Sequence, residues 1–392
     1  MKKITLKIVS FIIVVSMLIL VLPSVNVIAA KKTTISNKKI TLEYGKTKTL
    51  KIKGLKKSEK VSWSSSNKKV AYVDSKGKVK AIKVGTVKII ATVGGKKYTC
   101  KVTVFKQKTD KELLTDFIND LKANGAKIDY GIYDSKFTWG QKGRLTGIKL
   151  SYCSISGPVS IPNFKWLKSL DCSGNTISSL DVSKLPRLET LRCVFNRITS
   201  LNLNKNLALE TLKCSYNLLT DLDVSKLTLL ENLECVVNQI EQLDLSNQRF
   251  LETVYCQYNK LSELKFSNKA SCLYILNCEE NMLTDLDLSK CSGLIELKCN
   301  NNLLRSLQIY GSPYLFEINC MDNELSELDL RGCKNLMEIK CSYNKLTNLR
   351  VTGLEFLFEL YCGNNQLTTL DVTGCDWLYT LSIDSGVNVI GR

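Results

Sequence analysis

Ten cysteines recur at an almost constant interval between residues 172 and 362, and this period constrains the fold more than any other feature of the sequence. Eight of the nine gaps are 21 residues long and one is 22. A unit this short cannot bury an apolar face by itself, so successive units must stack on one another and share a continuous core. The period therefore predicts a solenoid. The ladder cysteines are Cys172, Cys193, Cys214, Cys235, Cys256, Cys278, Cys299, Cys320, Cys341 and Cys362.

Each unit repeats the same pattern around its cysteine. A leucine lies five residues before the cysteine, an aliphatic residue lies two before it, and an asparagine lies three after it. Alternation along a strand would point the aliphatic residue and the cysteine inward and their neighbours outward. The asparagine would lie where the chain leaves the strand, where its amide can bond backbone groups that the turn leaves unpaired. The ladder asparagines are Asn175, Asn196, Asn217, Asn238, Asn259, Asn281, Asn302, Asn323, Asn344 and Asn365.

The pattern L-x-x-L-x-C-x-x-N-x-L-x-x-L resembles the leucine-rich repeat of bacterial internalin-like proteins, with cysteine in place of the third leucine. The resemblance covers residues 141–383 and includes a leading copy with Cys153 at the asparagine position. It also includes a trailing copy that lacks the asparagine. The resemblance implies a curved solenoid with a parallel sheet on its concave side, a fold used mostly for protein binding.

The ladder cysteines are interpreted as small buried hydrophobic residues. On in-register parallel strands about 4.8 Å apart their Cβ atoms point the same way, which disfavours disulfide geometry. Whether a cysteine outside the ladder forms a disulfide stays open. The chain has no C-x-x-C pair and no histidine. This excludes histidine-based zinc sites and Ser-His or Cys-His catalysis, and we expect no metal and no cofactor.

Residues 31–105 differ from the rest of the chain in charge and pattern. They contain 21 lysines and three acids, a net charge of +18, whereas residues 106–392 carry a net charge of −3. Short runs of alternating apolar and polar residues separated by glycines predict an antiparallel β-sandwich. The segments Val61–Asn67, Val70–Asp74 and Gly85–Val87 resemble the bacterial immunoglobulin-like domain of group 2. That resemblance implies a spacer or adhesive module of an exported protein.

The lysines of this domain alternate with apolar residues and should point outward. One reading is a soluble face that protects edge strands, and the other is a tether for anionic wall polymers or other polyanions. Nucleic acid is not expected as a partner because the chain is expected to be exported.

The remaining segments complete a multidomain prediction of an all-β immunoglobulin-like sandwich followed by a leucine-rich-repeat solenoid. Residues 1–30 have the basic, apolar and small-residue order of a signal peptide, and no membrane span is expected after its cleavage. A capping-box sequence at Thr109–Glu112 predicts a helix within a linker and N-terminal cap over 106–140. Residues 384–392 are expected to be a C-terminal tail. The protein should be secreted or extracellular, either free or associated with the cell wall.

Outward positions of the strands supply the candidate binding residues on the concave face. Exposed aromatic residues offer a large contact area, although tyrosine also has an intrinsic preference for strands. In the later coils, glutamates occupy the position three residues before each ladder cysteine, so neighbouring carboxylates repel one another unless positive charge offsets them. Lys298 and Lys340 are candidates for that positive charge. The position four residues before the ladder cysteine holds glutamate in earlier coils and apolar residues in later coils. These apolar residues are either extra core or a contact surface. The candidates are Phe195, Tyr216, Tyr255, Tyr258, Tyr343, Tyr361, Glu296, Glu317, Glu338 and Glu359.

The sequence favours a secreted or cell-surface, adhesin-like binding protein over an enzyme, and no catalytic residue is predicted. The expected partner is a host or bacterial surface protein or glycan. Two alternatives remain open, a cell-wall glycan hydrolase using paired carboxylates and a structural wall spacer without a specific ligand.

Overall fold

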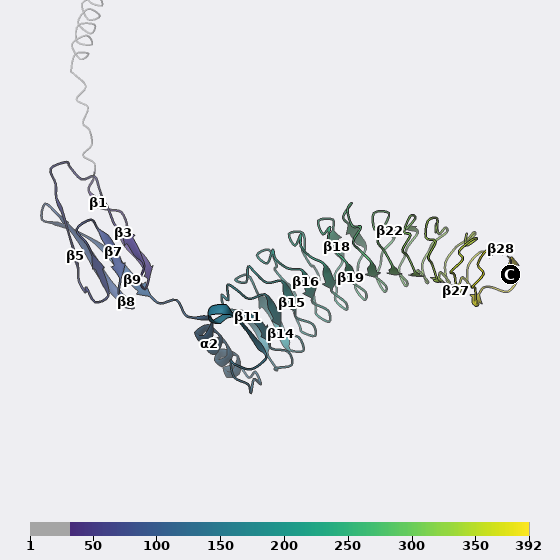
Figure 1. Ribbon diagram of the computed structural model, residues 1–392, viewed down its shortest axis with the longest axis horizontal. Helices are drawn as coiled ribbons and strands as arrows, with labels where there is room; N and C mark the ends of the chain where they lie inside the picture. Colours follow the sequence, from purple (N-terminus) through teal and green to yellow (C-terminus); the bar gives the residue numbers. More distant parts are fainter. Residues whose placement is uncertain (1–31, 392) are drawn as a thin grey trace, which may run out of the picture. The chain divides into compact units, whose positions relative to one another are not determined.

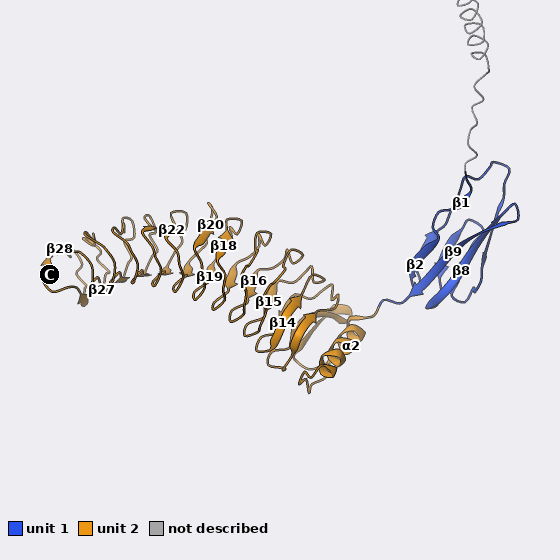
Figure 2. Ribbon diagram, turned by 180° about the vertical axis from the view of Figure 1, so that it is seen from behind, with its two compact units in different colours: residues 1–107 blue, residues 108–392 orange. Residues whose placement is uncertain are grey.

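The computed structural model describes residues 32–391, and the chain divides into two compact units, residues 1–107 and 108–392 (Figure 2). The predicted signal peptide lies outside the described residues. Within residues 32–391, no helix is both long enough and apolar enough to cross a membrane.

The first unit is a sandwich of two sheets around a core that includes Val79, Ile89, Cys100 and Val102. This confirms the immunoglobulin-like prediction. The four-stranded sheet has the order β2 (Lys39–Glu43), β9 (Lys96–Phe105), β8 (Gly85–Val93) and β5 (Val61–Ser65). The second sheet has the order β3 (Thr47–Thr49), β7 (Lys78–Ala81) and β6 (Ala71–Val73), and β1 (Thr34–Ile35) pairs with β4 (Ile52–Lys53).

One strand pair corrects the prediction of a purely antiparallel sandwich. β2 and β9 are parallel, with Lys39 opposite Lys101 and Glu43 opposite Phe105. Turn residues in the sequence specify only hairpins between consecutive strands. The first and last long strands meet only when the sandwich closes, so no local signal encodes their direction.

The second unit begins with helix α2 (Asp110–Ala123), whose capping box between Thr109 and Glu112 is formed. Its buried face, which includes Leu114 and Phe117, joins the same core as the solenoid. The Asp110 carboxylate accepts a hydrogen bond of 2.9 Å from the backbone N–H of Leu145, which fixes the helix start to the first coil. β10 (Phe137–Gly140) and a short 3₁₀ turn (Gln141–Gly143) lead into β11 (Arg144–Lys149).

A 13-stranded sheet lines the concave side of the solenoid (Figure 1). β10 is antiparallel to β11, and every later pair is parallel. Each strand from β13 on is three residues long and ends one residue before its ladder cysteine, or before Ile383 in the case of the last strand, β29. These strands are β13 (Ser169–Asp171), β15 (Thr190–Arg192), β16 (Thr211–Lys213), β17 (Asn232–Glu234), β19 (Thr253–Tyr255), β21 (Ile275–Asn277), β23 (Glu296–Lys298), β25 (Glu317–Asn319), β26 (Glu338–Lys340), β27 (Glu359–Tyr361) and β29 (Thr380–Ser382).

Shorter parallel pairs form on the other side of the coils. They are β12 (Ser156–Ser160) with β14 (Thr176–Asp181), β18 (Gln242–Leu245) with β20 (Glu263–Phe266), β22 (Asp285–Asp287) with β24 (Ser306–Gln308), and β28 (Thr369–Asp371) with β30 (Asn388–Ile390). The last pair corrects the expectation of a tail over 384–392. Val387 and Val389 pack against the core, so this segment continues the solenoid.

The ladder cysteines are buried in the common core. Burial raises the pKa of the Cys193 and Cys320 thiols to about 12. The thiol, and not the reactive thiolate, is therefore the form present at neutral pH.

The ladder asparagines bind neighbouring coils to one another. The Asn217 Nδ2 group donates to the carbonyl oxygens of Cys193 and Cys214, each at 3.0 Å. Its Oδ1 accepts from the backbone N–H of Ile198 at 3.0 Å. One buried amide therefore satisfies backbone groups of two coils, and this arrangement recurs along the solenoid.

Candidate binding surfaces

Four of the predicted aromatic residues lie in a turn and not on a strand, which corrects their predicted position. Phe195, Tyr216, Tyr258 and Tyr343 come two residues after a ladder cysteine, and their φ angles lie between 55° and 58°. The preceding strand has already ended three residues earlier. The chain must turn away from the sheet here, and the left-handed conformation makes that turn. Their side chains are exposed along one edge of the concave sheet.

The backbone conformation changes how these residues are explained. A preference of tyrosine for strands does not apply to a left-handed turn, which favours glycine, asparagine and aspartate. Other coils follow that preference, with Asn301, Asp322 and Asn364 at the same position. The aromatic residues therefore occupy a position that the backbone disfavours, which points to a role of their side chains outside folding.

Two of these aromatic residues, in adjacent coils, contact each other. The rings of Phe195 and Tyr216 stack with centroids 4.3 Å apart and an interplanar angle of 20°. Tyr152 extends the edge at its N-terminal end, with the same left-handed backbone and an exposed side chain. A Cβ at Gly174 would come within 2.3 Å of the Tyr152 ring, so glycine leaves the space that the ring occupies. We call Tyr152, Phe195, Tyr216 and Tyr258 the aromatic edge.

The sequence predictions missed Tyr152 because the column of aromatic residues was followed only through coils that have a ladder cysteine. The alignment of Cys153 with the ladder asparagines already places Leu150 at the ladder position and Tyr152 in the same column as Phe195 and Tyr216.

Tyr255 and Tyr361 lie on strands β19 and β27, one residue before their ladder cysteines, and both are half-buried on the concave face. The Tyr361 hydroxyl donates to the Glu359 carboxylate at 2.9 Å. Tyr343 and Tyr361 therefore belong to later coils than the aromatic edge, and the candidates form two groups along the solenoid.

The predicted glutamate column is continuous. Glu296, Glu317, Glu338 and Glu359 occupy the first position of four adjacent strands and lie directly opposite one another. We call these residues the glutamate column. The Lys298 Nζ lies 2.7 Å from the Glu296 carboxylate and 3.7 Å from that of Glu317, and Lys340 pairs with Glu338. Two lysines therefore offset four glutamates, which leaves the column with net negative charge.

The immunoglobulin-like unit carries a row of three lysines across adjacent strands. In the four-stranded sheet, Lys101 of β9 lies opposite both Lys39 of β2 and Lys88 of β8. Like charges in directly opposed positions repel and destabilise the sheet. The ion pairs found within residues 32–391 include no lysine of residues 32–105. We call Lys39, Lys88 and Lys101 the lysine row.

Hydroxyl groups border the lysine row. Thr41, Thr103 and Thr86 form the next outward row on the same three strands. This face therefore combines uncompensated positive charge with neutral hydrogen-bonding groups, which suits an anionic polymer with its own polar groups.

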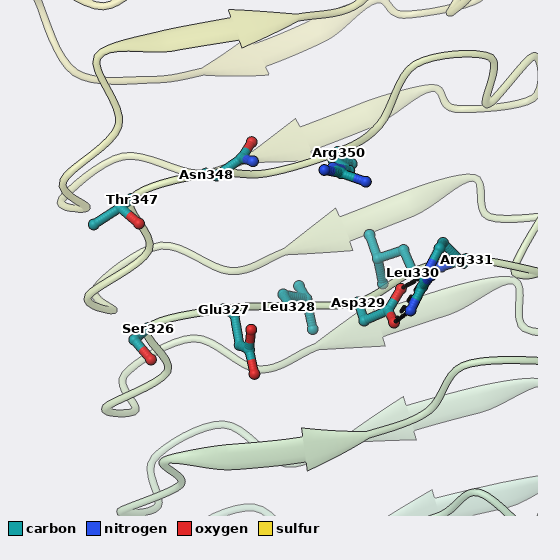
Figure 3. Close-up of a pocket in the computed structure, with 9 residues that line it drawn as sticks. All are labelled: Ser326, Glu327, Leu328, Asp329, Leu330, Arg331, Thr347, Asn348 and Arg350. Atoms are coloured by element: carbon teal, nitrogen blue, oxygen red, sulfur yellow. Dashed lines mark hydrogen bonds and ion pairs between the residues drawn. The ribbon is translucent and has the colours of Figure 1, made fainter.

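A groove of about 500 Å³ lies between two coils on the side away from the sheet (Figure 3). Its carboxyl groups belong to Glu327 and Asp329. Arg331 binds the Asp329 carboxylate, with Nη2 2.6 Å from Oδ2, and this contact holds the pKa of Asp329 below its ordinary value. A glycosidase acid needs a carboxyl group that stays protonated. Asp329 is therefore unsuited to act as the general acid of a glycan hydrolase, the enzyme considered as an alternative above.

Comparisons with known proteins agree with both parts of the fold. Residues 29–111 match the family model of the bacterial Ig-like domain (group 2). Residues 165–206 match the model of leucine rich repeats (2 copies). Among curated proteins, none matches the sequence.

Two solved structures from Listeria monocytogenes are similar to the solenoid. The first is the functional domain of InlJ, which includes a cysteine ladder, with 31% identity and a TM-score of 0.58. That match covers 62% of this chain and 54% of the InlJ chain, so this chain spans about half the length of that structure. The second is the internalin InlF, with 18% identity, a TM-score of 0.48, and coverage of 72% of this chain and 96% of that chain.

The fold and these matches define a modular protein with two different kinds of domain. The chain combines a bacterial immunoglobulin-like domain of group 2 with an internalin-like leucine-rich-repeat solenoid that carries a cysteine ladder.

Proposed function

We propose that this protein is a secreted or cell-surface adhesin-like protein that recognises a host or bacterial surface protein or glycan through the concave side of its solenoid. Export would depend on the signal peptide predicted over residues 1–30. The solenoid would bind the ligand, and the immunoglobulin-like unit would act as a spacer or polyanion tether.

The aromatic edge is the observation that carries this proposal. Exposed bulky residues in left-handed turns cost about 1 kcal/mol each relative to residues suited to that conformation. The coil does not require aromatic residues here, since other coils use asparagine or aspartate at the same position. Large, rigid aromatic side chains are the residues that most often dominate binding at protein interfaces. A ligand that covers the edge would supply the compensating free energy.

A substitution that suits the backbone tests this proposal without harming the fold. In the triple variant Phe195→Asn, Tyr216→Asn and Tyr258→Asn, each new residue repeats the one that Asn301 and Asn364 supply in other coils. We expect the fluorescently labelled variant to lose at least tenfold in affinity for epithelial cells and for purified bacterial cell walls, measured separately, against whichever surface the unaltered chain binds.

The matched control replaces exposed aromatic residues away from the edge, with Phe250→Asn and Tyr310→Asn. It should bind as the unaltered chain does. Equal binding by the triple variant and the unaltered chain would refute recognition through the aromatic edge.

The lysine row supports the polyanion tether as a second role. A polymer that neutralises the three lysines releases condensed counterions, so its binding should weaken steeply with salt. The triple variant Lys39→Gln, Lys88→Gln and Lys101→Gln should bind heparin and linear polyphosphate at least tenfold more weakly at 0.1 M salt. Polyphosphate and heparin distinguish a phosphodiester-like from a sulfated ligand.

The control Lys56→Gln, Lys57→Gln and Lys60→Gln removes the same charge from the same unit but leaves the lysine row intact. It should lose less than threefold. Equal losses in the two triple variants would mean that net charge, and not the row, attracts the polymer. The lysines would then be a solubilising surface.

A further inference from the structure

A second exposed surface lies on the later coils, at the position directly before each strand. Five successive coils carry an apolar residue there, four residues before the ladder cysteine. The backbone N–H of each residue from Ile295 to Phe358 donates to the carbonyl of the equivalent residue in the preceding coil, as between Phe316 and Ile295 at 2.8 Å. We call this set the apolar strip. Its members are Tyr274, Ile295, Phe316, Met337 and Phe358.

The apolar strip is not part of the core. Ile295, Phe316 and Phe358 are 45%, 47% and 40% exposed. Tyr274 and Met337 are half-buried. The sequence left open whether this column is extra core or a contact surface, and the structure places three of its five members in solvent and none in the core. An exposed apolar surface of this kind is characteristic of an interaction site.

Earlier coils show that the backbone does not require apolar residues at this position. Glu189, Glu210, Glu231 and Glu252 occupy it there, with the same backbone hydrogen bonds between coils. The two sets meet where the Tyr274 hydroxyl donates to the Glu252 carboxylate at 3.2 Å. The change from glutamate to apolar residues therefore alters the surface without altering the coil.

The apolar strip runs beside the glutamate column. Each glutamate of the column is the residue that follows a member of the strip, from Ile295–Glu296 to Phe358–Glu359. Among residues 32–391, only Lys298 and Lys340 form ion pairs with these four carboxylates, so a partner that covers the strip with apolar groups also meets negative charge. Complementarity therefore requires a partner that is apolar on one face and basic beside it.

The chemistry of the strip favours a polypeptide over a sugar. A sugar ring binds against an open aromatic face, but one face of the Phe358 ring is covered by Tyr379, with centroids 5.5 Å apart and an interplanar angle of 9°. Ile295 and Met337 interrupt the aromatic members and offer only hydrocarbon. Aliphatic and aromatic side chains of a protein pack on such a surface without needing open rings.

The spacing of the coils favours a helix over a strand. Neighbouring coils are about 4.8 Å apart at the sheet, whereas one turn of an α-helix rises about 5.4 Å. Over four steps the two repeats differ by only about 2 Å. Same-face residues of an extended strand recur about every 6.7 Å, which gives a difference of about 8 Å over the same distance. The strip would match about 13 residues of helix.

We propose that the apolar strip and the glutamate column together form a docking surface for a basic amphipathic helix of a partner protein. The helix lies along the solenoid axis, with apolar residues at i, i+3/i+4 and i+7 on the strip and lysine or arginine residues facing the glutamates. This inference goes beyond the proposed function. The two share the glutamate column, and the experiment below separates them.

The test uses an 18-residue helical peptide of leucine and lysine, labelled for fluorescence anisotropy and titrated with the full chain. Phe316→Gln with Phe358→Gln should weaken binding at least tenfold, and glutamine is a close match to the glutamate tolerated in earlier coils. Glu317→Gln with Glu338→Gln should weaken it at least threefold and flatten its salt dependence, because attraction between unlike charges is screened by salt.

Two controls locate the binding. Leu229→Ser with Phe250→Ser removes exposed apolar residues from earlier coils and should change affinity by less than twofold. The aromatic-edge triple variant should also keep its affinity for the peptide. Loss in that variant would place the peptide on the aromatic edge, which overturns this inference but leaves the proposed function intact.

Three further outcomes would overturn the proposed docking surface. They are no binding at 1 mM peptide, equal weakening in the control pair and the strip pair, and equal affinity for a leucine–glutamate peptide of the same pattern.

Discussion

The earlier and later coils of the solenoid share one interior but present different exteriors. Both halves bury the same leucines, cysteines and asparagines. The half with Cys172 to Cys256 carries aromatic residues in its left-handed turns and glutamates before its strands. The half with Cys278 to Cys362 carries mostly polar residues in the turns, glutamates on the strands and apolar residues before them. The change falls at the 22-residue gap between Cys256 and Cys278.

This difference separates what the fold requires from what it permits. Stacking fixes the buried positions, because each coil must complete the core of its neighbours. The outward positions carry no such requirement, so they are free to vary. Under the two proposals above, the two halves would provide separate binding surfaces on one scaffold.

The largest expected effect concerns the shared interior. Asn217→Ala in the earlier half and Asn323→Ala in the later half should each lower the free energy of unfolding by about 3 kcal/mol. Each removes three hydrogen bonds to the backbone and leaves one buried backbone N–H, that of Ile198 or Leu304, without its acceptor. Urea unfolding measures both. The two losses should agree within about 1 kcal/mol.

The exposed Asn348→Ala serves as the control and should change stability by less than about 0.5 kcal/mol. A large loss in only one half would contradict a common interior.

The second effect is a dependence of stability on alkaline pH. Burial raises the pKa of Cys235 and Cys278 to about 12, whereas an unfolded thiol ionises near about 8.5. A raised native pKa contributes stability that is fully present below the unfolded pKa and is lost as pH rises toward the native pKa. The free energy of unfolding should therefore fall between pH 9 and 11, by about 1.4 kcal/mol per pH unit for each such thiol.

Unfolding in urea at several pH values measures this slope. Cys235→Ala in the earlier half and Cys278→Ala in the later half should each reduce the slope of unfolding free energy against pH by about 1.4 kcal/mol per pH unit. An unchanged slope in either variant would mean that the altered thiol is already accessible to water.

A smaller effect distinguishes the left-handed turns of the two halves. Val237 is a β-branched residue with φ 51°, and Asn301 occupies the same position with φ 54°. Val237→Asn should raise the free energy of unfolding by about 1 kcal/mol, and Asn301→Val should lower it by a similar amount. Thermal unfolding of the reciprocal pair checks this, and effects of the same sign would contradict the assigned backbone conformation.

The sequence predicted features that repeat and missed those that depend on long-range geometry. The interval between cysteines predicted the repeating coil, and alternation along the strand predicted that Leu191 and Cys193 are buried. Both signals are local and recur ten times. The left-handed conformation at Phe195 was missed, since a strand and the turn after it carry similar apolar residues. The parallel pairing of β2 with β9, and with it the opposition of Lys39 and Lys101, was missed because it joins segments about 60 residues apart.

The most direct test of inside and outside uses the chain's 16 cysteines. Cys272 is exposed and the other 15 are buried. The native, reduced protein should therefore add one equivalent of a water-soluble maleimide, at Cys272, and the denatured protein should add 16, as intact-mass and peptide mass spectrometry can measure. Rapid native labelling of the ladder cysteines would contradict the buried ladder and the surfaces assigned from it.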